Sequence, residues 1–441
     1  MRKIVLLSLL AGGALAGRQL RAAGFGLYEV DAASTAMGGH VVASPRNASS
    51  VYYNPGAMGV NTSATITVGM TVIRPLADAR IDKTRDVQMD PGWIGFPTFF
   101  LTAPLPWGLH FGFGSYADFG IASQYPRNWE LKHDSIKTQF EGYTLQTALS
   151  WDITDKWSIG AGPRFTWVNF ETQKVFDFGY VDRMMQQISG GYLHAAYRGR
   201  NRLKIQADNE DDIGIGLTAG TRYQLTDDFA LGATFRSRVK TRLKGTARWS
   251  GDDFGYRNSL SEEIQLPAQV SLGFNWDDAL WVEGLHLGSS VSWIEWSKMH
   301  ALRFDVFTPN PILGGGTVQQ EEIKLDWRNT YRAGFGLGYD LTENWDVMAG
   351  YVYDWDPSRN MIDYSHTMLP VGDRHIATTG LSWRPGGGNW EISLAYALVI
   401  LESKTQMQKD EYYNNNNPIV HRVHNHHSYT HLVSIGVSYS F

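Results

Sequence analysis

The chain has 441 residues, no cysteine, a formal net charge of -5 at pH 7, and 19% charged against 13% aromatic residues. The lack of cysteine excludes disulfide scaffolds, thiolate metal sites and cysteine nucleophiles, and the acidic balance argues against nucleic-acid binding. Only one long apolar run is present, at residues 4–16, so the sequence excludes a bundle of membrane-spanning helices.

The amino end has the pattern of a secretory signal peptide. Arg2 and Lys3 precede the apolar run, and small residues follow it as far as Ala22 and Ala23. A cationic start, a short apolar core and a small-residue cleavage zone are typical of export signals, and the run is too short for a spanning helix. We therefore expect residues 1–22 to be removed and the mature chain to begin near Ala23. A membrane anchor is the alternative.

In the rest of the chain the apolar residues recur with period two. In the last nine residues one face holds Val433, Ile435, Val437, Tyr439 and Phe441, and the other holds only Ser and Gly. The clearest alternating segments are 143–153, 157–170, 229–244, 321–341 and 345–355. They fit the roughly 9–11 residues with which a tilted strand crosses a bilayer. Aromatic residues near the strand ends suit interfacial girdles, at Trp107, Trp151, Trp157, Trp345, Tyr351, Trp383 and Trp390.

Short and long connections alternate along the chain. The short ones are polar, at 154–156, 226–228, 342–344 and 385–389, and the long ones are 77–92, 118–135, 177–209, 250–261, 308–319, 360–371 and 407–426. Transmembrane barrels have this alternation of short turns and long outer loops. It predicts an all-β protein, a transmembrane antiparallel β-barrel of about 14 strands. A secreted soluble β-protein or a propeller is the alternative, although no repeat of roughly 40–50 residues supports a propeller.

Two alternating segments carry cations on one face. In segment 229–244, Leu231, Ala233, Phe235, Val239 and Leu243 alternate with Arg236, Arg238, Lys240, Arg242 and Lys244. In segment 321–341, Ile323, Leu325, Trp327, Tyr331, Phe335 and Leu337 alternate with Lys324, Asp326, Arg328 and Arg332. A cation facing lipid costs about 2–4 kcal/mol near the midplane, so we expect both basic faces to line the lumen. Arg238, Arg328 and Arg332 are candidates for binding a carboxylate head group. Pairing with acids such as Glu263, Glu322 and Asp326 is the structural alternative.

The period changes inside the longest loop. Met184, Met185, Ile188 and Leu193 are spaced for one face of a short amphipathic helix. Flexible Met-rich surfaces suit variable apolar ligands, so these residues are candidates for capturing an apolar substrate. Packing on the barrel rim, or contact with lipopolysaccharide, is the alternative.

Two polar segments could suggest a metal site. His421, His424, His426, His427 and His431 follow an asparagine run, and residues 208–212 read Asp-Asn-Glu-Asp-Asp. Neither has the supporting ligand pattern of a zinc or calcium site, so solvated loops are expected. A Gly-x-Ser-x-Gly nucleophile elbow is also missing from the sequence. We therefore expect no metal, no cofactor and no enzymatic activity.

Several segments, taken in order, resemble the FadL/TodX family of outer-membrane channels for hydrophobic compounds. They are Ala-Gly-Phe-Gly-Leu-Tyr-Glu at 23–29, Asn47 to Met58 around Asn54-Pro55-Gly56, Trp-Ile-Glu-Trp-Ser at 293–297, Trp-Arg-Asn-Thr-Tyr-Arg at 327–332, and the terminal Tyr-Ser-Phe at 439–441. Each is weak alone, and their shared order over roughly 400 residues carries the resemblance. Gly56 stands where the family usually has Ala, so the bend there is expected to differ locally.

The resemblance implies a barrel over residues 61–441, plugged by an amino-terminal hatch over residues 23–60. Phe25, Asn54, Pro55 and Gly56 would hold or gate this hatch. An apolar substrate would be captured between loops 177–209 and 250–261 and pass to a pocket near the hatch. A kink in the third strand, over about 107–119, would then open the wall sideways. Gly112, Gly114, Phe119 and Gly120 mark that opening, although small lumen-facing glycines are an equal alternative.

The resemblance also implies a passive channel in the outer membrane of a Gram-negative bacterium, surrounded by membrane lipid and lipopolysaccharide. Its C-terminal strand would be recognised by the barrel assembly machinery. The cargo would be a hydrophobic small molecule, foremost a long-chain fatty acid, with a monoaromatic hydrocarbon as the alternative. A general porin, an outer-membrane lipase and a surface receptor barrel are the competing functions.

Overall fold

The computed structural model describes residues 24–82, 85–177, 200–250, 257–299, 301–309, 316–358, 372–410 and 419–441. The expected signal peptide lies outside this range. So do Met184, Met185, Ile188 and Leu193, the candidate capture residues. Among the described residues, no helix is long and apolar enough to cross a bilayer.

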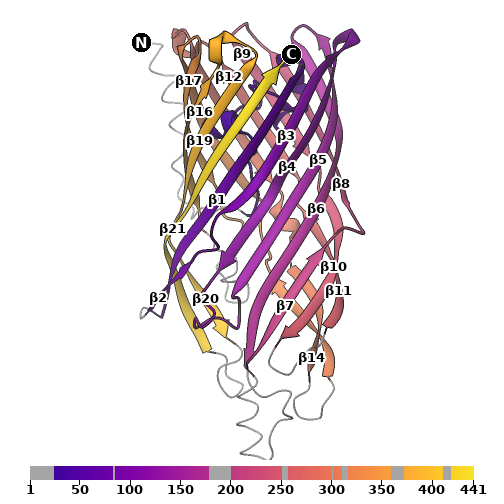
Figure 1. Ribbon diagram of the computed structural model, residues 1–441, viewed down its shortest axis with the longest axis vertical. Helices are drawn as coiled ribbons and strands as arrows, with labels where there is room; N and C mark the ends of the chain where they lie inside the picture. Colours follow the sequence, from indigo (N-terminus) through magenta and orange to yellow (C-terminus); the bar gives the residue numbers. More distant parts are fainter. Residues whose placement is uncertain are drawn as a thin grey trace, which may run out of the picture.

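The described strands form a closed antiparallel barrel (Figure 1). The ring runs through β1 (Thr65–Ile81), β3 (Ile94–Leu105), β4 (Leu109–Gln124), β5 (Lys137–Thr154), β6 (Trp157–Asp177), β8 (Gly214–Gln224), β9 (Phe229–Arg236), β12 (Gln269–Trp276), β13 (Leu285–Ile294), β16 (Thr330–Thr342), β17 (Trp345–Asp354), β18 (Arg374–Trp383), β19 (Trp390–Leu401) and β21 (Ile419–Ser440). β21 closes the ring on β1, from Thr65 opposite Ser440 to Ile81 opposite Val423. The described ring therefore has the fourteen strands just named, and the predicted closed barrel is confirmed.

Further strand segments extend the wall at the end that carries the long connections (Figure 1). They are β2 (Arg85–Met89), β7 (Arg200–Asp208), β10 (Val239–Ser250), β11 (Arg257–Leu266) and β20 (Lys404–Asp410), which bring the sheet to 19 strand segments. A separate hairpin consists of β14 (Ala301–Pro309) and β15 (Gly316–Lys324). The opposite end carries short turns and the C-terminus (Figure 1).

The short turns are made by local hydrogen bonds and short 3-10 helices. Thr154 Oγ1 accepts the amide N–H of Trp157 at 3.0 Å, and Thr342 Oγ1 accepts that of Trp345 at 3.1 Å. Three other turns contain η2 (Pro106–Gly108), η4 (Ala279–Trp281) and η7 (Pro385–Gly387). Trp107 is 88% exposed at a turn tip. Such turns join adjacent antiparallel strands and keep the wall continuous.

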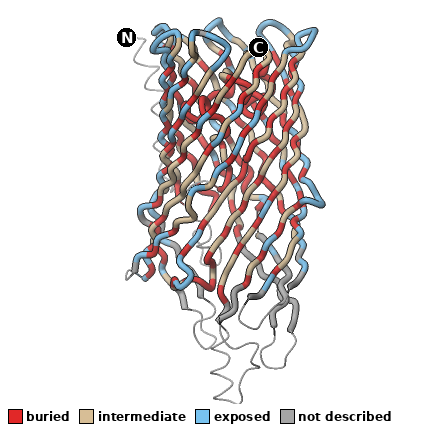
Figure 2. The backbone as a smooth tube through the Cα atoms, viewed as in Figure 1, coloured by how far each residue is buried: buried red, intermediate tan, exposed pale blue. Residues whose placement is uncertain are grey.

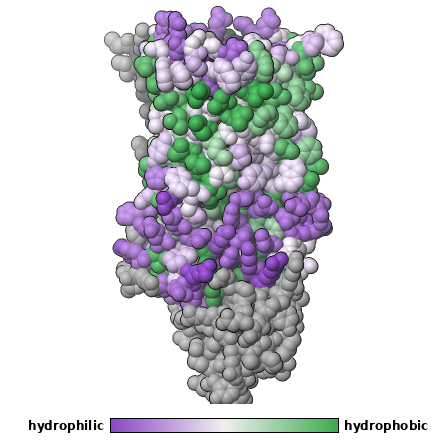
Figure 3. All heavy atoms as spheres, in the orientation of Figure 1, coloured by the Kyte–Doolittle hydropathy of each residue, from purple (hydrophilic) through white to green (hydrophobic). Residues whose placement is uncertain are grey.

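The outer wall has an apolar band near the short turns and a polar zone towards the long loops (Figure 3). Outward aromatic residues at the short-turn edge include Trp151, Trp157, Trp345, Trp383 and Trp390, as expected for an interfacial girdle. Tyr351 was expected in the same girdle, but its side chain is less exposed than these tryptophans and is half-buried. An apolar band between polar ends is the surface pattern of a barrel set in a membrane.

The prediction that the cations of segment 229–244 all line the lumen is wrong beyond Arg236. β9 ends there, and Ser237 and Arg238 interrupt the strand before β10 begins at Val239. Val239 and Leu243 are buried inside, whereas the side chain of Lys240 is 63% exposed on the outer wall. Because Arg236 and Val239 are both buried inside, the alternation shifts by one position at this interruption. Every later side chain then lies on the opposite face to the one expected, because the side-chain period of a strand is two.

A second interruption makes the prediction for the first part of segment 321–341 wrong in the same way. Leu325 and Trp327 are buried, not lipid-facing, whereas Tyr331, Phe335 and Leu337 are exposed as expected. Residues 325–329 lie between β15 and β16, and Asp326 there has a positive φ of 39°. The alternation restarts in another phase at Thr330, so Arg332 faces inward.

Residues 24–60 lie inside the barrel, close to the short-turn end (Figures 1 and 2). They form α2 (Ala32–Ala36), α3 (Ser50–Tyr53) and the 3-10 helix η1 (Pro55–Val60). α2 packs on β18, β19 and β21, and η1 packs on β5, β6 and β8. Asp31 caps α2 by accepting the amide N–H of Ser34 at 2.9 Å. Nearly all of this segment is buried, so it fills the lumen there.

Candidate functional site: a gap in the barrel wall and the cavity behind it

The wall is unpaired over part of the boundary between β3 and β4. The β3–β4 ladder runs only from Phe99 opposite Ser115 to Leu105 opposite Leu109. Beyond it, residues 94–98 of β3 pair with β1, and residues 116–124 of β4 pair with β5. These two stretches do not pair with each other among the described ladders, and this interruption of the backbone pairing is called the gap here.

A bulge in β4 produces this gap. The β4–β5 register shifts between Ala117 and Phe119, which makes Asp118 an extra residue in β4. Its carboxylate is buried and accepts the hydroxyl of Thr144 at 3.0 Å and Arg164 Nη1 at 3.1 Å. A bulge bends its strand and ends regular pairing. Bending here directs β4 away from β3.

The beginning of the hatch takes over the pairing that β3 leaves open. Gly26 forms a β-bridge with Phe119, Leu27 N donates to Asp118 O at 2.9 Å, and Gly120 N donates to Phe25 O at 2.8 Å. An added Cβ at Gly120 would lie 2.8 Å from Leu27 Cδ1, so glycine permits this close approach. The hatch thus closes the inner side of the gap by strand-like hydrogen bonds.

Phe25 anchors the hatch in an aromatic cluster beside the gap. Its ring centroid lies 6.1 Å from that of Phe119, 4.6 Å from Phe140, 5.1 Å from Trp296 and 5.6 Å from Trp327. All five side chains are buried. Sequence reasoning placed Phe25 and Phe119 at the hatch and the opening, and the structure brings them together.

A cavity of about 120 Å³ lies behind the gap. Residues 94 and 96 of β3 and 120–122 of β4 line its side at the gap, and Leu27 and Tyr28 of the hatch line its inner side. Its remaining wall is mostly apolar, with Ile73, Leu76, Phe140, Ile376, Val399, Leu401 and Leu432. The polar lining residues include Glu29, Gln139, Glu141, Asp354, Arg374 and Ser428. The cavity therefore lies between the hatch and the unpaired edges of β3 and β4.

Asp90 bridges the gap at its end nearer the long loops. Its amide N–H donates to Gln124 O of β4 at 3.0 Å, and its carboxylate accepts Arg74 Nη2 of β1 at 2.6 Å. The hydrogen bond from Arg74, together with that from the Gly92 amide, holds the pKa of the Asp90 carboxyl below its usual range. This bridge fixes one border of the gap.

The three candidate arginines already have partners. Arg238 Nη2 donates to Glu295 Oε1 at 2.6 Å, and Arg328 donates to the Asp356 carbonyl at 3.4 Å. Arg332 pairs with Glu29 Oε1 at 3.4 Å and lies over the Tyr28 ring, 4.3 Å from its centroid. None of the three lines the cavity behind the gap. Their role as carboxylate ligands stays a prediction.

Asn54, Pro55 and Gly56 fasten the hatch to the wall. Asn54 Nδ2 donates to Val42 O at 2.7 Å and to Thr221 O at 2.9 Å, and its Oδ1 accepts Gly56 N at 2.9 Å. An added Cβ at Gly56 would lie 2.6 Å from Gly220 O, so this bend fits against β8 only with glycine. Gly112 has a similar role on β4, where a Cβ would lie 2.4 Å from Met58 Sδ. At Gly114 it would meet the Phe100 ring.

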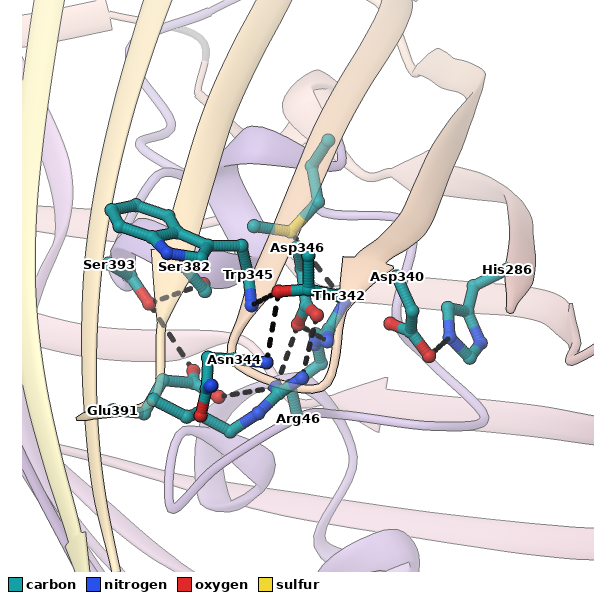
Figure 4. Close-up of polar contacts among 12 residues, drawn as sticks. Arg46, His286, Asp340, Thr342, Asn344, Trp345, Asp346, Ser382, Glu391 and Ser393 are labelled. Atoms are coloured by element: carbon teal, nitrogen blue, oxygen red, sulfur yellow. Dashed lines mark hydrogen bonds and ion pairs between the residues drawn. The ribbon is translucent and has the colours of Figure 1, made fainter. Parts of the chain in front are cut away.

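Sequence reasoning missed an ionic cluster that fastens the hatch near the short turns (Figure 4). Asp346 of β17 is fully buried and accepts Arg384 Nη2 at 2.6 Å, and it also pairs with Arg46 of the hatch. Arg384 Nη1 reaches Glu391 at 3.3 Å. Asp346 and Asp354 both occupy inward positions of β17. An acid on the lumenal face of a strand was the signal that could have found both.

The comparisons agree with this architecture. The profile of the family described as Outer membrane protein transport protein (OMPP1/FadL/TodX) matches residues 13–441. The chain belongs to this family. It is therefore an outer-membrane transport protein of a Gram-negative bacterium, from a family of channels for hydrophobic substrates, and the predicted location is confirmed.

Similar proteins span most of this FadL/TodX-family chain. An outer membrane protein of Neisseria meningitidis serogroup B is 27% identical over 433 residues, covering 89% of each chain. The long-chain fatty acid transport protein of Escherichia coli K12 is 23% identical, covering 70% of this chain and 73% of its own. The structure of a Pseudomonas aeruginosa FadL homologue has a TM-score of 0.79, 21% identity, and coverage of 95% and 100%. The Pseudomonas putida toluene transporter TodX has a TM-score of 0.67, 16% identity, and coverage of 93% and 98%. These two structures share the fold.

Proposed function

We propose that the chain takes up hydrophobic molecules passively, holds them in the cavity behind the gap, and releases them sideways into the outer membrane. The observation that carries the proposal is the course of the cavity, from Leu27 and Tyr28 of the hatch to the unpaired edges of β3 and β4. A hydrophobic molecule on this route stays in contact with apolar side chains. The long-loop end would face the outside and the short turns the periplasm.

The hatch supports the lateral direction of release. Residues 24–60 fill the lumen and are fastened by Asn54 near β8 and by the Arg46–Asp346 pair near the short turns. A route along the barrel axis would require these contacts to break, whereas the lateral gap lies next to the cavity. Each CH₂ group transferred from water to an apolar site contributes roughly 0.8 kcal/mol, which suffices to drive capture without an energy source.

The outer loops would supply the first capture site. Met184, Met185, Ile188 and Leu193 would offer an apolar face there, and this role remains a proposal. Membrane lipid and lipopolysaccharide would surround the wall, and the C-terminal strand β21 would be the segment that the barrel assembly machinery recognises. Membership of an outer-membrane family and the position of β21 as the closing strand support these proposed partners.

The names of similar proteins support two candidate cargo classes. Some relatives of the chain are long-chain fatty acid transport proteins. Some solved structures with the same fold are toluene transporters. A long-chain fatty acid would place its chain along the apolar wall, and a monoaromatic hydrocarbon would fill the same space without a head group. We propose uptake of hydrophobic molecules, with long-chain fatty acids first and monoaromatic hydrocarbons second.

The test is uptake by a Gram-negative host that lacks its own fatty-acid channel. Cells expressing this barrel would be compared with cells without it for labelled oleate, labelled toluene and a labelled sugar. Oleate or toluene should enter faster with the barrel, and the sugar should not. Equal entry of both hydrophobic probes with and without a folded barrel would contradict the proposal, and faster sugar entry would favour a general porin.

A further inference from the structure

We propose that Asp354 accepts a hydrogen bond from a donor group on the cargo. The cavity would then prefer apolar molecules that end in a hydroxyl group over plain hydrocarbons and ionised carboxylates. This inference rests on the proposed function, because it takes the cavity behind the gap as the cargo site. It adds a polar specificity group to a cavity whose other lining is mainly apolar.

Asp354 is a buried carboxylate with no hydrogen-bond partner for either oxygen among the described residues. It lines the cavity and is only 1% exposed. Ser428 also lines the cavity, is 6% exposed, and has a hydroxyl without a partner. Buried polar groups in folded proteins are nearly always hydrogen-bonded, because an unpaired one costs free energy. The cavity thus carries unpaired polar groups, and we infer that a bound molecule supplies the donor to Asp354.

The two arginines next to Asp354 are held by the hatch. Asp354 is the cross-strand neighbour of Arg332 on β16 and of Arg374 on β18. Arg332 turns to Glu29 Oε1 at 3.4 Å, and Arg374 Nη2 donates to Gly24 O at 2.7 Å. Neither forms an ion pair with Asp354 within 4.0 Å among the described contacts. Among the described residues the carboxylate of Asp354, which lines the cavity, is thus left without a hydrogen-bond or ion-pair partner.

Asp354 and Ser428 lie on one row of the barrel wall. The ladders place Asp354 opposite Arg374, Arg374 opposite Leu401, and Leu401 opposite Ser428. Three strand spacings of about 4.8 Å separate the two ends of this row. The next row is apolar, with Ile376 opposite Val399. A chain lying on the apolar row can therefore present its end group to Asp354.

The charges around the cavity decide between classes of head group. A hydroxyl donates to the carboxylate of Asp354, and such charge-assisted bonds are about twice as strong as neutral ones. An ionised carboxylate placed near Arg374 would face Asp354 across the same ladder pair, which opposes it by like-charge repulsion. A plain hydrocarbon would leave Asp354 unpaired. The cavity therefore favours an apolar molecule with an O–H donor, which is an alcohol or the protonated form of a fatty acid, over an ionised carboxylate.

The test compares 1-dodecanol, dodecane and dodecanoate at pH 7.5 in the host described above. The readout is the ratio of initial uptake rates within the same cells, so differences in barrel level cancel. In the wild type, dodecanol should enter faster than both other probes. Asp354→Leu should lower the dodecanol-to-dodecane ratio about tenfold, the size expected for one lost hydrogen bond to a charged group. Asp354→Asn keeps an acceptor and should lower it less.

Asp356→Asn is the matched control. Asp356 is also a buried carboxylate, but it accepts the Ser358 amide at 2.7 Å and does not line the cavity. The dodecanol-to-dodecane ratio of the Asp356→Asn variant should equal that of the wild type. An unchanged ratio in both Asp354 variants, with uptake intact, would overturn this inference and leave the proposed function standing. If Asp354→Leu fails to fold, an unchanged ratio in Asp354→Asn overturns it. Entry of none of the probes above background would contradict the proposed function itself.

Discussion

Single buried side chains hold the hatch, each through several hydrogen bonds. Asn54 makes three and is completely buried, and its loss would leave the carbonyls of Val42 and Thr221 without this donor. A buried polar group left unpaired costs about 1–3 kcal/mol. Such residues decide whether the lumen stays closed.

Asn54→Ala should therefore loosen the hatch by about 2–4 kcal/mol, the cost of two orphaned carbonyls less some repacking. Limited proteolysis in detergent would measure the rate of cleavage within residues 24–60. Asn61→Ala is the control, because Asn61 is half-buried and makes one side-chain bond, to Asn47 O at 2.9 Å. Equal cleavage rates for the two variants would show that Asn54 does not hold the hatch.

His40 makes the closed hatch sensitive to acid. Burial, together with the nearby Arg332, lowers the pKa of His40 to about 3. A free histidine binds a proton below about pH 6.5, but the docked hatch keeps His40 neutral. The docked state therefore loses stability as the pH falls from about 6.5 towards 3, at up to about 1.4 kcal/mol per pH unit.

Channel openings in planar bilayers should increase between pH 7 and pH 4.5 in the wild type. The increase should be smaller in His40→Gln, which cannot take up the proton but can still reach the Ser290 hydroxyl that His40 Nδ1 contacts at 2.7 Å. An identical pH response in both proteins would remove His40 as the cause.

At the residue level, the places of residues in a recognisable motif were easier to predict than the partners of buried charged residues. The resemblance to the family identified Asn54, Pro55, Gly56 and Phe25 as hatch residues, because they lie in segments that match its motifs. It did not identify Asp354 or Asp346, because their meaning depends on which hatch groups lie opposite them. Arg238, Arg328 and Arg332 were named for charge alone, and their actual partners come from distant parts of the chain.

Strand interruptions decide which side chains face the lumen and where the wall loses its backbone pairing. Period-two alternation predicts that a segment is a strand, but it does not show a single inserted residue. Ser237 and Arg238 move the cations of β10 to the outer wall, and the insertion before Thr330 buries Leu325 and Trp327. The third interruption, at Asp118, opens the gap. The predicted opening at Gly112, Gly114 and Gly120 lies on β4, the strand that contains the bulge, but the sequence did not show the bulge itself.

Deleting Asp118 should close the gap, because β4 would keep its register with β5 and could continue its ladder with β3. Uptake of hydrophobic probes should fall to the background of cells without the barrel. Asp118→Asn is the matched control, since it retains the extra residue while removing the charge that faces Arg164. It should keep most of the uptake. Full transport by a folded deletion variant would contradict a role of the bulge.

At the scale of the whole molecule, the barrel was the most predictable part. Long alternating segments and the alternation of short and long connections leave few other folds, because a spanning sheet must close to pair its edges. How the hatch lies in the lumen was not predictable from alternation, since its contacts with β5, β6, β8, β18 and β19 join residues far apart in the sequence.

Deleting residues 24–60 should raise the ion conductance of the purified barrel in planar bilayers from nearly closed to that of an open pore, because the lumen loses its filling. Folding of the variant would be checked by its heat-modifiable mobility in electrophoresis. Arg46→Ala, which removes one hatch contact with Asp346, should produce only brief openings. Unchanged conductance in a folded deletion variant would show that the hatch does not plug the barrel.

The most direct measurement blocks the gap reversibly. Because the chain has no cysteine, Ala122→Cys places one thiol at the gap, where Ala122 lines the cavity. A bulky thiol reagent attached through a disulfide should stop uptake of hydrophobic probes, and a reductant should restore it. Lys240→Cys, exposed on the outer wall away from the gap, should carry the same reagent without effect. Continued uptake by fully labelled Ala122→Cys would contradict lateral release through this gap.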